Sequence, residues 1–412
     1  MAQETIDRLE VLYHINQTIH SSLDLDVVLN LVMDEVIAAT RAERGFLMLR
    51  GPDGEMVFQV ARGMDQQTIA SPEFEVSRTV VRRVTETGEA STDADWPTGT
   101  DSMKMIGVRS IMCIPMRTRE SGEVIGLVYV DSRVQHEIFN DEDRKLLTAI
   151  AADAVGAIEN ARLHRIALEK ERMEREQEAA RQLQISLLPQ RTPQLDGWEF
   201  ATCWYPAHEV SGDFYDFIPL HDGKTGVVLA DVSDKGMAAA MFMAISRNTV
   251  RGSVAQHAAP ADCICQANRL ICADSLDNMF VSLFYLEMTD AGDLEYVNAG
   301  HNPPLLYQAA SGEIRQLERT GMVVGLFDDV DYEQAALTMS PGDCLLLYTD
   351  GLTESVNADL EEFGLERACA VLMEHLGDSA GEAVAALEAA LGEFTGPTEQ
   401  FDDITLVLIK YL

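Results

Sequence analysis

Residues 211–231, SGDFYDFIPLHDGKTGVVLAD, contain two strand-like runs joined by a short polar turn. The pair Asp222-Gly223 in that turn is typical of a tight β-hairpin. Asp213 lies nine residues before Asp222, and Asp231 lies nine residues after it. A hairpin centred at Asp222 therefore places the carboxylates of Asp213 and Asp231 opposite each other at its open end, with Cβ atoms roughly 5 Å apart.

Further aspartates stand at the ends of two strand-like runs later in the chain. The run CLLLYTD ends in Asp350, and FDDITLVLI begins with Asp402 and Asp403. Strands that end in Asp and strands that begin with Asp meet at one edge when they run antiparallel. We therefore expect these carboxylates to lie near the hairpin pair. An aspartate beside a strand is usually a turn residue, and Asp216, Asp222, Asp234 and Asp343 are interpreted as turn or surface residues.

Carboxylates gathered at one edge repel one another unless protons or cations neutralise them. Oxygen-only ligands suit Mg²⁺ or Mn²⁺ better than Zn²⁺. Three or four carboxylates are enough for two ions that share a bridging Asp. Two such ions, roughly 3.5–4 Å apart, activate a shared water and clamp a phosphoryl oxygen for in-line attack. The pattern thus indicates hydrolysis of a phosphate ester.

Five motifs that follow one another in the chain resemble those of the PPM phosphatases, namely SGDFYDF, LADVSDKGMAAAMFM, NAGHNPPLL, LLLYTDGLTES and FDDITLVLI. More narrowly they resemble the bacterial SpoIIE-like branch, which dephosphorylates regulators of sigma factors. The resemblance covers about 185–412. It implies an α/β/β/α sandwich that holds two Mn²⁺ or Mg²⁺ ions at one edge of its central sheets, with metal-bound water as the nucleophile.

The same resemblance implies a set of metal ligands: Asp213, Asp231, the backbone carbonyl of Val232, Asp350, Asp402 and Asp403. Asp231 would bridge the ions, and Asp213, Asp231 and Asp350 would be the catalytic residues. In the last motif Asp402 aligns best with the family's ligand, and Asp403 is the second choice.

Two positions depart from the eukaryotic members of the family. A His that serves them as general acid is replaced by Ser233, and an Arg that holds phosphate has His208 near its place. Both departures resemble the bacterial branch. The leaving-group acid stays open between Lys235 and solvent.

The N-terminal part has the order helix, short antiparallel strands, long helix, which predicts an α+β sensor module. The strand-like runs are GFLMLR, EMVFQVA, SIMCIPM and EVIGLVYVDS, and the long helix begins with Asp141 as its N-cap. RSIMCIPM, GEVIGLVYVDS and FNDEDRKLL are similar to GAF domains over about 5–160. Such domains bind small molecules or mediate dimerisation. Cys113 and His136 are interpreted as a buried strand cysteine and a surface histidine, not as haem or redox residues.

The long helix is expected to continue to about residue 188, with a highly charged middle. Eight of the twelve residues of Lys170–Arg181 are charged, which favours a solvated helix, with a weak heptad pattern. LLPQ at 187–190 resembles the switch segment that precedes the catalytic domain of this branch. The predicted domains are a GAF-like sensor (1–160), a helical linker (161–192) and a PPM-type phosphatase (193–412). A parallel homodimer through the linker is the expected assembly.

The composition excludes several other classes of protein. A net charge of −37 over 412 residues disfavours nucleic acid and anionic lipid as partners. The start of the chain is not a signal peptide, and no apolar run is long enough to span a membrane. Seven cysteines without a C-x-x-C pair indicate reduced thiols and a cytoplasmic protein.

The sequence therefore predicts a metal-dependent Ser/Thr protein phosphatase that a GAF-like sensor regulates through a small-molecule or protein signal. Its expected substrate is a phosphoserine or phosphothreonine on a regulatory protein, namely an anti-sigma-factor antagonist. The alternative is a pseudophosphatase or a docking protein with a sensory domain. A diguanylate cyclase is disfavoured because SGDFYDF lacks the acidic fourth residue of that enzyme's loop, and a histidine kinase because no Gly-rich ATP lid follows His164.

Overall fold

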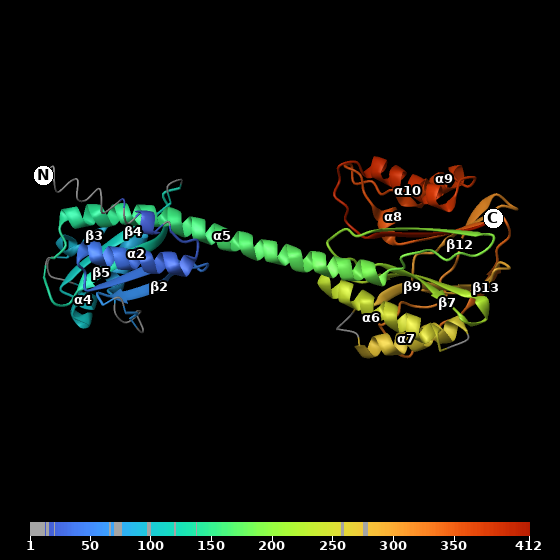
Figure 1. Ribbon diagram of the computed structural model, residues 1–412, viewed down its shortest axis with the longest axis horizontal. Helices are drawn as coiled ribbons and strands as arrows, with labels where there is room; N and C mark the ends of the chain where they lie inside the picture. The colour runs from blue at the N-terminus through green and yellow to red at the C-terminus, as the bar shows by residue number, and fades with distance from the viewer. Residues whose placement is uncertain are drawn as a thin grey trace. The chain divides into compact units, whose positions relative to one another are not determined.

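The chain forms two structural units, Met1–Met173 and Glu174–Leu412, in the computed structural model. The residues that the structure describes are 13, 16–19, 21–65, 67–69, 76–96, 100–118, 121–136, 138–256, 259–274 and 279–412. Each unit is built around its own antiparallel sheet or sheets (Figure 1).

A five-stranded antiparallel sheet with the order β2-β1-β5-β4-β3 lies at the centre of the N-terminal unit. Its strands are β1 (Arg44–Arg50), β2 (Met56–Gly63), β3 (Ser91–Thr92), β4 (Ser110–Arg117) and β5 (Val124–Ser132). The central strands are apolar on both faces, because helices cover both. The run SIMCIPM, for example, buries Met112 and Ile114 on one face and Ile111 and Cys113 on the other.

Helix α2 (Leu25–Thr40) and the beginning of α5 (Asp141–Leu187) cover one face of this sheet, and α3 (Arg78–Thr87) and α4 (Asp101–Ile106) cover the other. A short 3₁₀ turn, η2 (Asp93–Asp95), follows β3. Cys113 is fully buried in β4 and His136 is exposed, as the sequence indicated.

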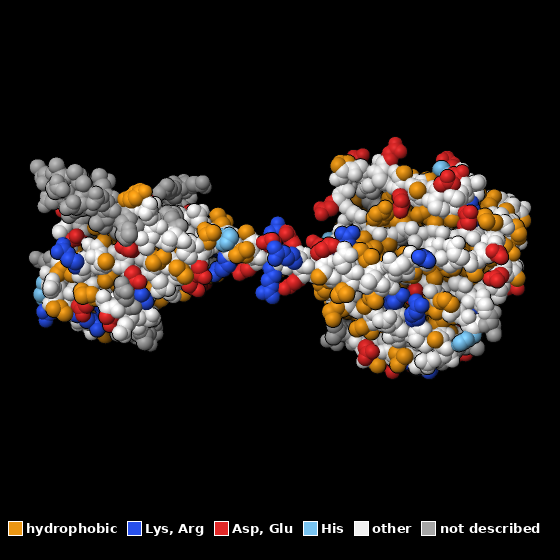
Figure 2. Space-filling model, viewed as in Figure 1, with side chains coloured by type: hydrophobic (Ala, Val, Ile, Leu, Met, Phe, Trp, Pro, Cys, Tyr) orange, Lys and Arg blue, Asp and Glu red, His pale blue; other side chains and the backbone are white. Residues whose placement is uncertain are grey.

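Helix α5 extends over 47 residues, so the predicted continuation of the long helix is confirmed. Its N-cap is Asn140, one residue before the predicted Asp141. The Asn140 side chain accepts from the backbone N–H groups of Glu142 and Asp143, and the Asp143 carboxylate accepts from the N–H of Asn140. Along the exposed middle of α5, basic and acidic side chains alternate (Figure 2), as expected for a solvated helix.

Two five-stranded antiparallel sheets make up the C-terminal unit, with the orders β13-β10-β9-β8-β7 and β12-β11-β14-β15-β6. The first contains β7 (Phe214–Pro219), β8 (Thr225–Val232), β9 (Val281–Met288), β10 (Asp293–Ala299) and β13 (Ala335–Thr338). The second contains β6 (Trp198–Tyr205), β11 (Leu305–Gln308), β12 (Glu313–Gln316), β14 (Cys344–Tyr348) and β15 (Ile404–Tyr411).

Helices cover the outer faces of the two sheets and complete a four-layer sandwich (Figure 1). Helices α6 (Met237–Val254) and α7 (Pro260–Asp274) pack on the first sheet, and α8 (Asp350–Glu354), α9 (Gly364–Glu374) and α10 (Ala380–Thr395) pack on the second. Alternation along β14 shows the layering. Leu345 and Leu347 join the core between the sheets, whereas Leu346 and Tyr348 join the core beneath α9 and α10.

The β7–β8 hairpin has the register that the sequence predicted. Phe214 pairs with Ala230 and Pro219 with Thr225, around a short 3₁₀ turn at His221–Gly223. The same register, continued by one residue, brings Asp213 opposite Asp231. The hairpin therefore presents both aspartates at its open end.

Two other expectations concern the whole chain. All seven cysteines are free. Among the described helices, none has both the length and the apolar composition needed to cross a lipid bilayer.

Candidate metal centre

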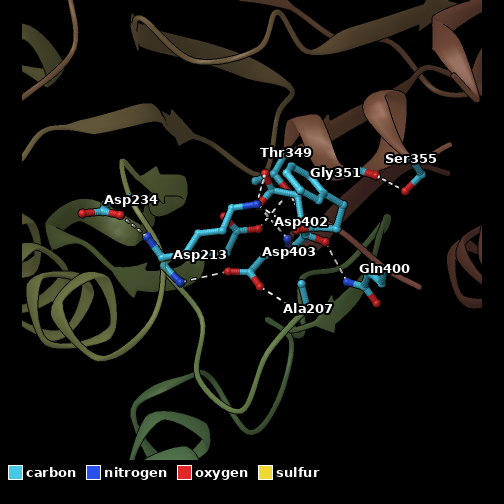
Figure 3. A network of polar contacts seen from close by, with 12 residues as sticks. Ala207, Asp213, Asp234, Thr349, Gly351, Ser355, Gln400, Asp402 and Asp403 are labelled. Carbon is cyan, nitrogen blue, oxygen red and sulfur yellow. Dashed lines mark hydrogen bonds and ion pairs between the residues drawn. The ribbon is translucent and has the colours of Figure 1, made fainter. Parts of the chain in front are cut away.

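The aspartates singled out by the sequence converge from both sheets on one edge of the sandwich. Asp213 precedes β7 and Asp231 is the penultimate residue of β8. Asp350 begins α8 directly after β14, and Asp402 and Asp403 lead into β15. Figure 3 shows Asp213, Asp402 and Asp403 in one network of polar contacts. The five carboxylates therefore lie at the ends of two strand pairs, β7–β8 in the first sheet and β14–β15 in the second.

Asp213 is the most deeply buried member of this group, with 1% of its surface exposed. The hydroxyls of Thr349 and Thr405 both donate to its Oδ2, at 2.8 Å and 2.6 Å. Burial raises the pKa of the Asp213 carboxyl well above its ordinary value, and the charges of Asp231 and Asp403 raise it further. The two threonine hydroxyls oppose this shift because they stabilise the ionised form.

The pKa values of Asp231 and Asp350 are also raised. Burial, followed by the charges of Asp350 and Asp402, raises the pKa of Asp231 to about 7. Burial and the charge of Asp402 raise the pKa of Asp350 to about 6. Each of these carboxylates is therefore destabilised by its neighbours, and the site as a whole favours a bound positive charge.

The adjacent residues Asp402 and Asp403 have different environments. Asp403 accepts three hydrogen bonds from the loop before β7: from the Ala207 N–H (2.7 Å), the Ser211 hydroxyl (2.7 Å) and the Gly212 N–H (2.9 Å). Asp402 keeps a third of its side chain exposed and forms an ion pair with Lys235, with Nζ and Oδ2 3.0 Å apart. Asp403 thus anchors a loop, while Asp402 faces the open side of the site.

The backbone approaches closely at two glycines of the site. A Cβ at Gly212 would lie 3.0 Å from the carbonyl oxygen of Val232, a tight contact that would push the carbonyl aside by a few tenths of an ångström. A Cβ at Gly351 would collide with the carbonyl oxygen of Asp403. Asp234 has a φ of 76°, in the left-handed region, in the loop between β8 and α6.

The three residues considered for proton transfer or phosphate binding lie in different settings. Ser233 exchanges two hydrogen bonds with the backbone of Phe280, so it holds the end of β8 to the residue that precedes β9. His208 is exposed, next to Ala207. Lys235 donates to the carbonyl of Phe401 at 2.7 Å, and its Nζ lies 3.9 Å from the centre of the Phe401 ring.

Sequence reasoning missed the side chains that hold the carboxylates in place: Gln184, Ser211, Thr349 and Thr405. His301, in the motif NAGHNPPLL, is another. Its Nδ1 lies 2.7 Å from the hydroxyl of Ser282, which pairs with Asp231 across β8 and β9. Burial lowers the pKa of His301 to about 3, so the ring is neutral and fixes the strand that faces Asp231.

The donor chemistry of the edge fits Mg²⁺ or Mn²⁺, because every candidate ligand is a carboxylate or carbonyl oxygen. Within the part of the chain that the structure describes, no three His, Cys, Asp or Glu side chains are arranged as the ligands of one metal ion. Part of the negative charge at this edge is neutralised by the ammonium of Lys235, which forms an ion pair with Asp402. The residues therefore fit a divalent cation by donor type and by charge.

The four-layer arrangement of the C-terminal unit has a counterpart among solved structures. The structure is similar to the SiaA-PP2C domain of Pseudomonas aeruginosa, with a TM-score of 0.54 and 20% identity over 60% of this chain and 100% of that one. This likeness confirms the predicted sandwich. The C-terminal unit therefore has the fold of PP2C phosphatase domains.

Sequence comparisons match two parts of the chain to known families. Residues 221–412 match the family model of stage II sporulation protein E (SpoIIE), and residues 24–160 match that of the GAF domain. Protein IcfG of Synechocystis is 32% identical in an alignment of 266 positions that covers 57% of this chain and 41% of IcfG. The phosphoserine phosphatase RsbU of Bacillus subtilis is 28% identical over 57% of this chain and 69% of RsbU.

The chain therefore contains an N-terminal region similar to GAF domains and a C-terminal region similar to stage II sporulation protein E, as the sequence motifs indicated.

Proposed function

We propose that this protein is a metal-dependent Ser/Thr protein phosphatase regulated by its GAF domain. The observation that carries the proposal is the convergence of Asp213, Asp231 and Asp350 at one sheet edge, each with a pKa raised by burial and by neighbouring carboxylates. Such a site is stabilised by hard divalent cations, and phosphate ester hydrolysis is the chemistry that two of them support.

The residues that would hold two Mn²⁺ or Mg²⁺ ions are Asp213, Asp231, the Val232 carbonyl, Asp350 and Asp402. When bound, Mn²⁺ or Mg²⁺ supplies an activated water and polarises the phosphoryl group. Asp403, the second choice from sequence, acts instead through its hydrogen bonds to the loop before β7. This division is supported by the contacts of the two residues, since both oxygens of Asp403 accept hydrogen bonds from that loop, whereas Asp402 pairs with the side chain of Lys235.

Lys235 is the proposed cationic contact for the substrate phosphate. Its side chain is 39% exposed and already lies beside a candidate ligand. An ammonium at the mouth of the site attracts a phosphoryl group and can donate a proton to the leaving oxygen. His208, which is exposed and forms no described contact with the carboxylates, is the weaker candidate.

The proposed substrate is a phosphoserine or phosphothreonine on a regulatory protein, specifically an anti-sigma-factor antagonist. This follows from the similarity to a phosphoserine phosphatase, RsbU, and from the SpoIIE family match. The chain spans 41% of IcfG and 69% of RsbU, so the activity of the whole protein is a proposal. The proposal also includes a cytoplasmic location and a homodimeric assembly.

The first test is hydrolysis of p-nitrophenyl phosphate and of a phosphoserine peptide by the full chain, with and without Mn²⁺ or Mg²⁺. We expect metal-dependent turnover in the wild type and its loss in Asp231→Asn. Asp290→Asn, an exposed turn residue outside the site, is the matched control and should retain activity. Absence of turnover in the wild type at all metal concentrations would favour the alternative, a pseudophosphatase or docking protein.

Regulation by the GAF domain needs a separate comparison, between the full chain and residues 174–412. A difference in metal-dependent turnover between the two proteins would support regulation, and its sign would give the direction. Equal rates for both, with any metal, would contradict a regulatory role in the isolated protein.

A further inference from the structure

Gln184 is a buried polar residue in the last turn of α5, with 4% of its surface exposed. Its neighbours on the helix, Gln182 and Leu183, are exposed, and the Leu183 side chain is 69% exposed. The amide of Gln184 therefore points into the C-terminal unit while the adjacent side chains face solvent. A buried amide in this position requires partners for both its donor and its acceptor.

Both partners belong to the backbone of a single residue, Ser211. The Ser211 N–H donates to Gln184 Oε1 at 3.0 Å, and Gln184 Nε2 donates to the Ser211 carbonyl at 2.8 Å. A longer contact, 3.4 Å, runs from Nε2 to the carbonyl of Ala240 in α6. This pair of bonds fixes both the position and the orientation of the peptide groups around Ser211.

Ser211 in turn holds the carboxylates of the candidate metal centre. Its hydroxyl donates to Asp403 Oδ2 at 2.7 Å and accepts from the Asp213 N–H at 3.0 Å. Gly212, the next residue, donates to the same oxygen of Asp403 and packs against the Val232 carbonyl. One residue thus separates the amide of Gln184 from two aspartates of the site.

We propose that Gln184 is a positioning residue that sets the metal affinity of the phosphatase site. It does so by holding Ser211 and Gly212 where Asp213 and Asp403 are correctly oriented. The proposal rests on the proposed function, since it requires that these carboxylates hold metal ions. The same contacts connect the end of α5 to the metal site, because a shift of the helix end would move the Ser211 backbone.

The side-chain chemistry explains why glutamine is suited to this position. Only an amide offers a donor and an acceptor side by side, as a backbone N–H and carbonyl require. Methionine has nearly the same length but would leave both groups of Ser211 buried without partners. Glutamate could accept from the N–H but could not donate to the carbonyl.

The test measures Mn²⁺ binding by isothermal titration calorimetry in the full chain, beside thermal unfolding and steady-state kinetics. We expect Gln184→Met to raise the Mn²⁺ Kd about tenfold, with kcat largely restored at saturating metal. Gln182→Met, on the exposed side of the same helix, should bind Mn²⁺ as the wild type does. A role in folding alone predicts a lower unfolding temperature with an unchanged Kd, and that result would overturn the proposal.

A second variant tests the route through Ser211. Ser211→Ala removes the hydroxyl that contacts Asp403 but keeps the backbone groups that contact Gln184. It should raise the Mn²⁺ Kd as well, and the double variant should be less impaired than the product of the single effects. If the increases in Kd of the two single variants multiply in the double variant, the two residues act independently, and this would contradict a shared route through Ser211. If Gln184→Met fails to fold, Gln184→Glu and Ser211→Ala carry the same test, and an unchanged Kd in both would overturn it.

The outcome is separable from that of the proposed function. If the wild type binds no Mn²⁺ and shows no turnover, the proposed function fails. If the wild type binds Mn²⁺ and hydrolyses the phosphopeptide but Gln184→Met has the same Kd, only the role of Gln184 fails.

Discussion

The ammonium of Lys235 lies 3.0 Å from the carboxylate of Asp402 and is fixed there by the residue before it, Phe401. The carbonyl of Phe401 accepts a hydrogen bond from Nζ, and its ring lies 3.9 Å below. Lys235 therefore holds a positive charge beside a candidate metal ligand. A cation bound by Asp402 and the ammonium repel each other, so metal binding and the Lys235–Asp402 ion pair compete.

This competition gives the first prediction. We expect Lys235→Met to lower the Mn²⁺ Kd about fivefold, since like-charge repulsion across a few ångströms at a partly exposed site costs about 1 kcal/mol. Turnover of a phosphoserine peptide should fall at least about tenfold, because the phosphoryl group loses its cationic contact. Calorimetry and steady-state kinetics check the two effects. Lys224→Met, which removes an ion pair just before β8, at the end opposite Asp231, should change neither, and a raised Kd in Lys235→Met would refute the competition.

A second ion-pair network lies beneath α6. Asp216 in β7 is 2% exposed, and its carboxylate lies 3.0 Å from Arg247 and 2.7 Å from Arg251. This corrects the interpretation of Asp216 as a turn or surface residue. We expect Asp216→Asn to destabilise the C-terminal unit by about 3–5 kcal/mol, because both guanidinium groups would lose their counter-charge.

Urea unfolding, followed through the fluorescence of Trp198 and Trp204, checks this value. Asp196→Asn, at an exposed turn, is the control and should change the stability by no more than about 0.5 kcal/mol. A loss below about 1 kcal/mol in Asp216→Asn would mean that the arginines find other partners.

The features that the sequence predicted well depend on local signals. The position of Asp213 opposite Asp231 followed from one turn and from equal spacing on either side of it, and the register of β7 and β8 agrees. The aspartates at strand ends followed from hydrophobic runs that stop at a carboxylate. The four-layer fold followed from the family resemblance that the five motifs carry in their order along the chain.

The features that it missed depend on contacts between distant segments. Asp216 looks like a turn residue until α6 is known to place Arg247 and Arg251, four residues apart, above β7. Gln184 lies 27 residues from Ser211 in sequence, with a proline-rich segment between them. The prediction for the N-cap of α5 was wrong by one residue, because the cap is Asn140 and not Asp141. Asn and Asp are equally good N-caps, and only backbone geometry chooses between them.

The N-terminal unit contains a buried ion pair whose strength should depend on pH. Asp131 in β5 is fully buried, and Arg44 in β1 contacts both of its oxygens. Burial raises the pKa of Asp131 from 3.8 to about 6, although Arg44 opposes the shift. Between these values the native state holds a proton that the unfolded chain has lost. Stability therefore increases as the pH falls through 6, and is lost as the pH rises.

We expect the stability of the wild type relative to Asp131→Asn to increase by about 2 kcal/mol when the pH falls from about 7.5 to about 4.5. Hydrogen exchange of the β1 and β5 amides in the full chain measures it within this unit. In Arg44→Met the increase should begin at a higher pH, because the opposing charge is gone. A difference between wild type and Asp131→Asn that stays constant with pH would show that Asp131 does not take up a proton in this range.

The last prediction concerns Gly351, in the helical turn directly after Asp350. A methyl group there would meet the carbonyl oxygen of Asp403 and also crowd Ile404, so it would displace the backbone between Asp402 and β15. Backbone cannot move aside as a flexible side chain does, and overpacking of this kind costs about 1–3 kcal/mol.

Gly351→Ala should therefore lower the turnover of the phosphoserine peptide about a hundredfold, the effect expected when catalytic groups are misplaced by about 1 Å. Ordinarily, alanine stabilises a helix relative to glycine by up to about 1 kcal/mol, so a loss here has to come from the contact with Asp403. Gly381→Ala separates the two effects, because nothing lies near a Cβ at that position of α10 and the variant should be active and as stable as the wild type or more so. Steady-state kinetics at saturating Mn²⁺ and thermal unfolding of both variants provide the comparison. Full activity in Gly351→Ala would mean that the segment carrying Asp402 and Asp403 can shift without disturbing the site, and the close packing of α8 against it would then have no part in positioning the carboxylates.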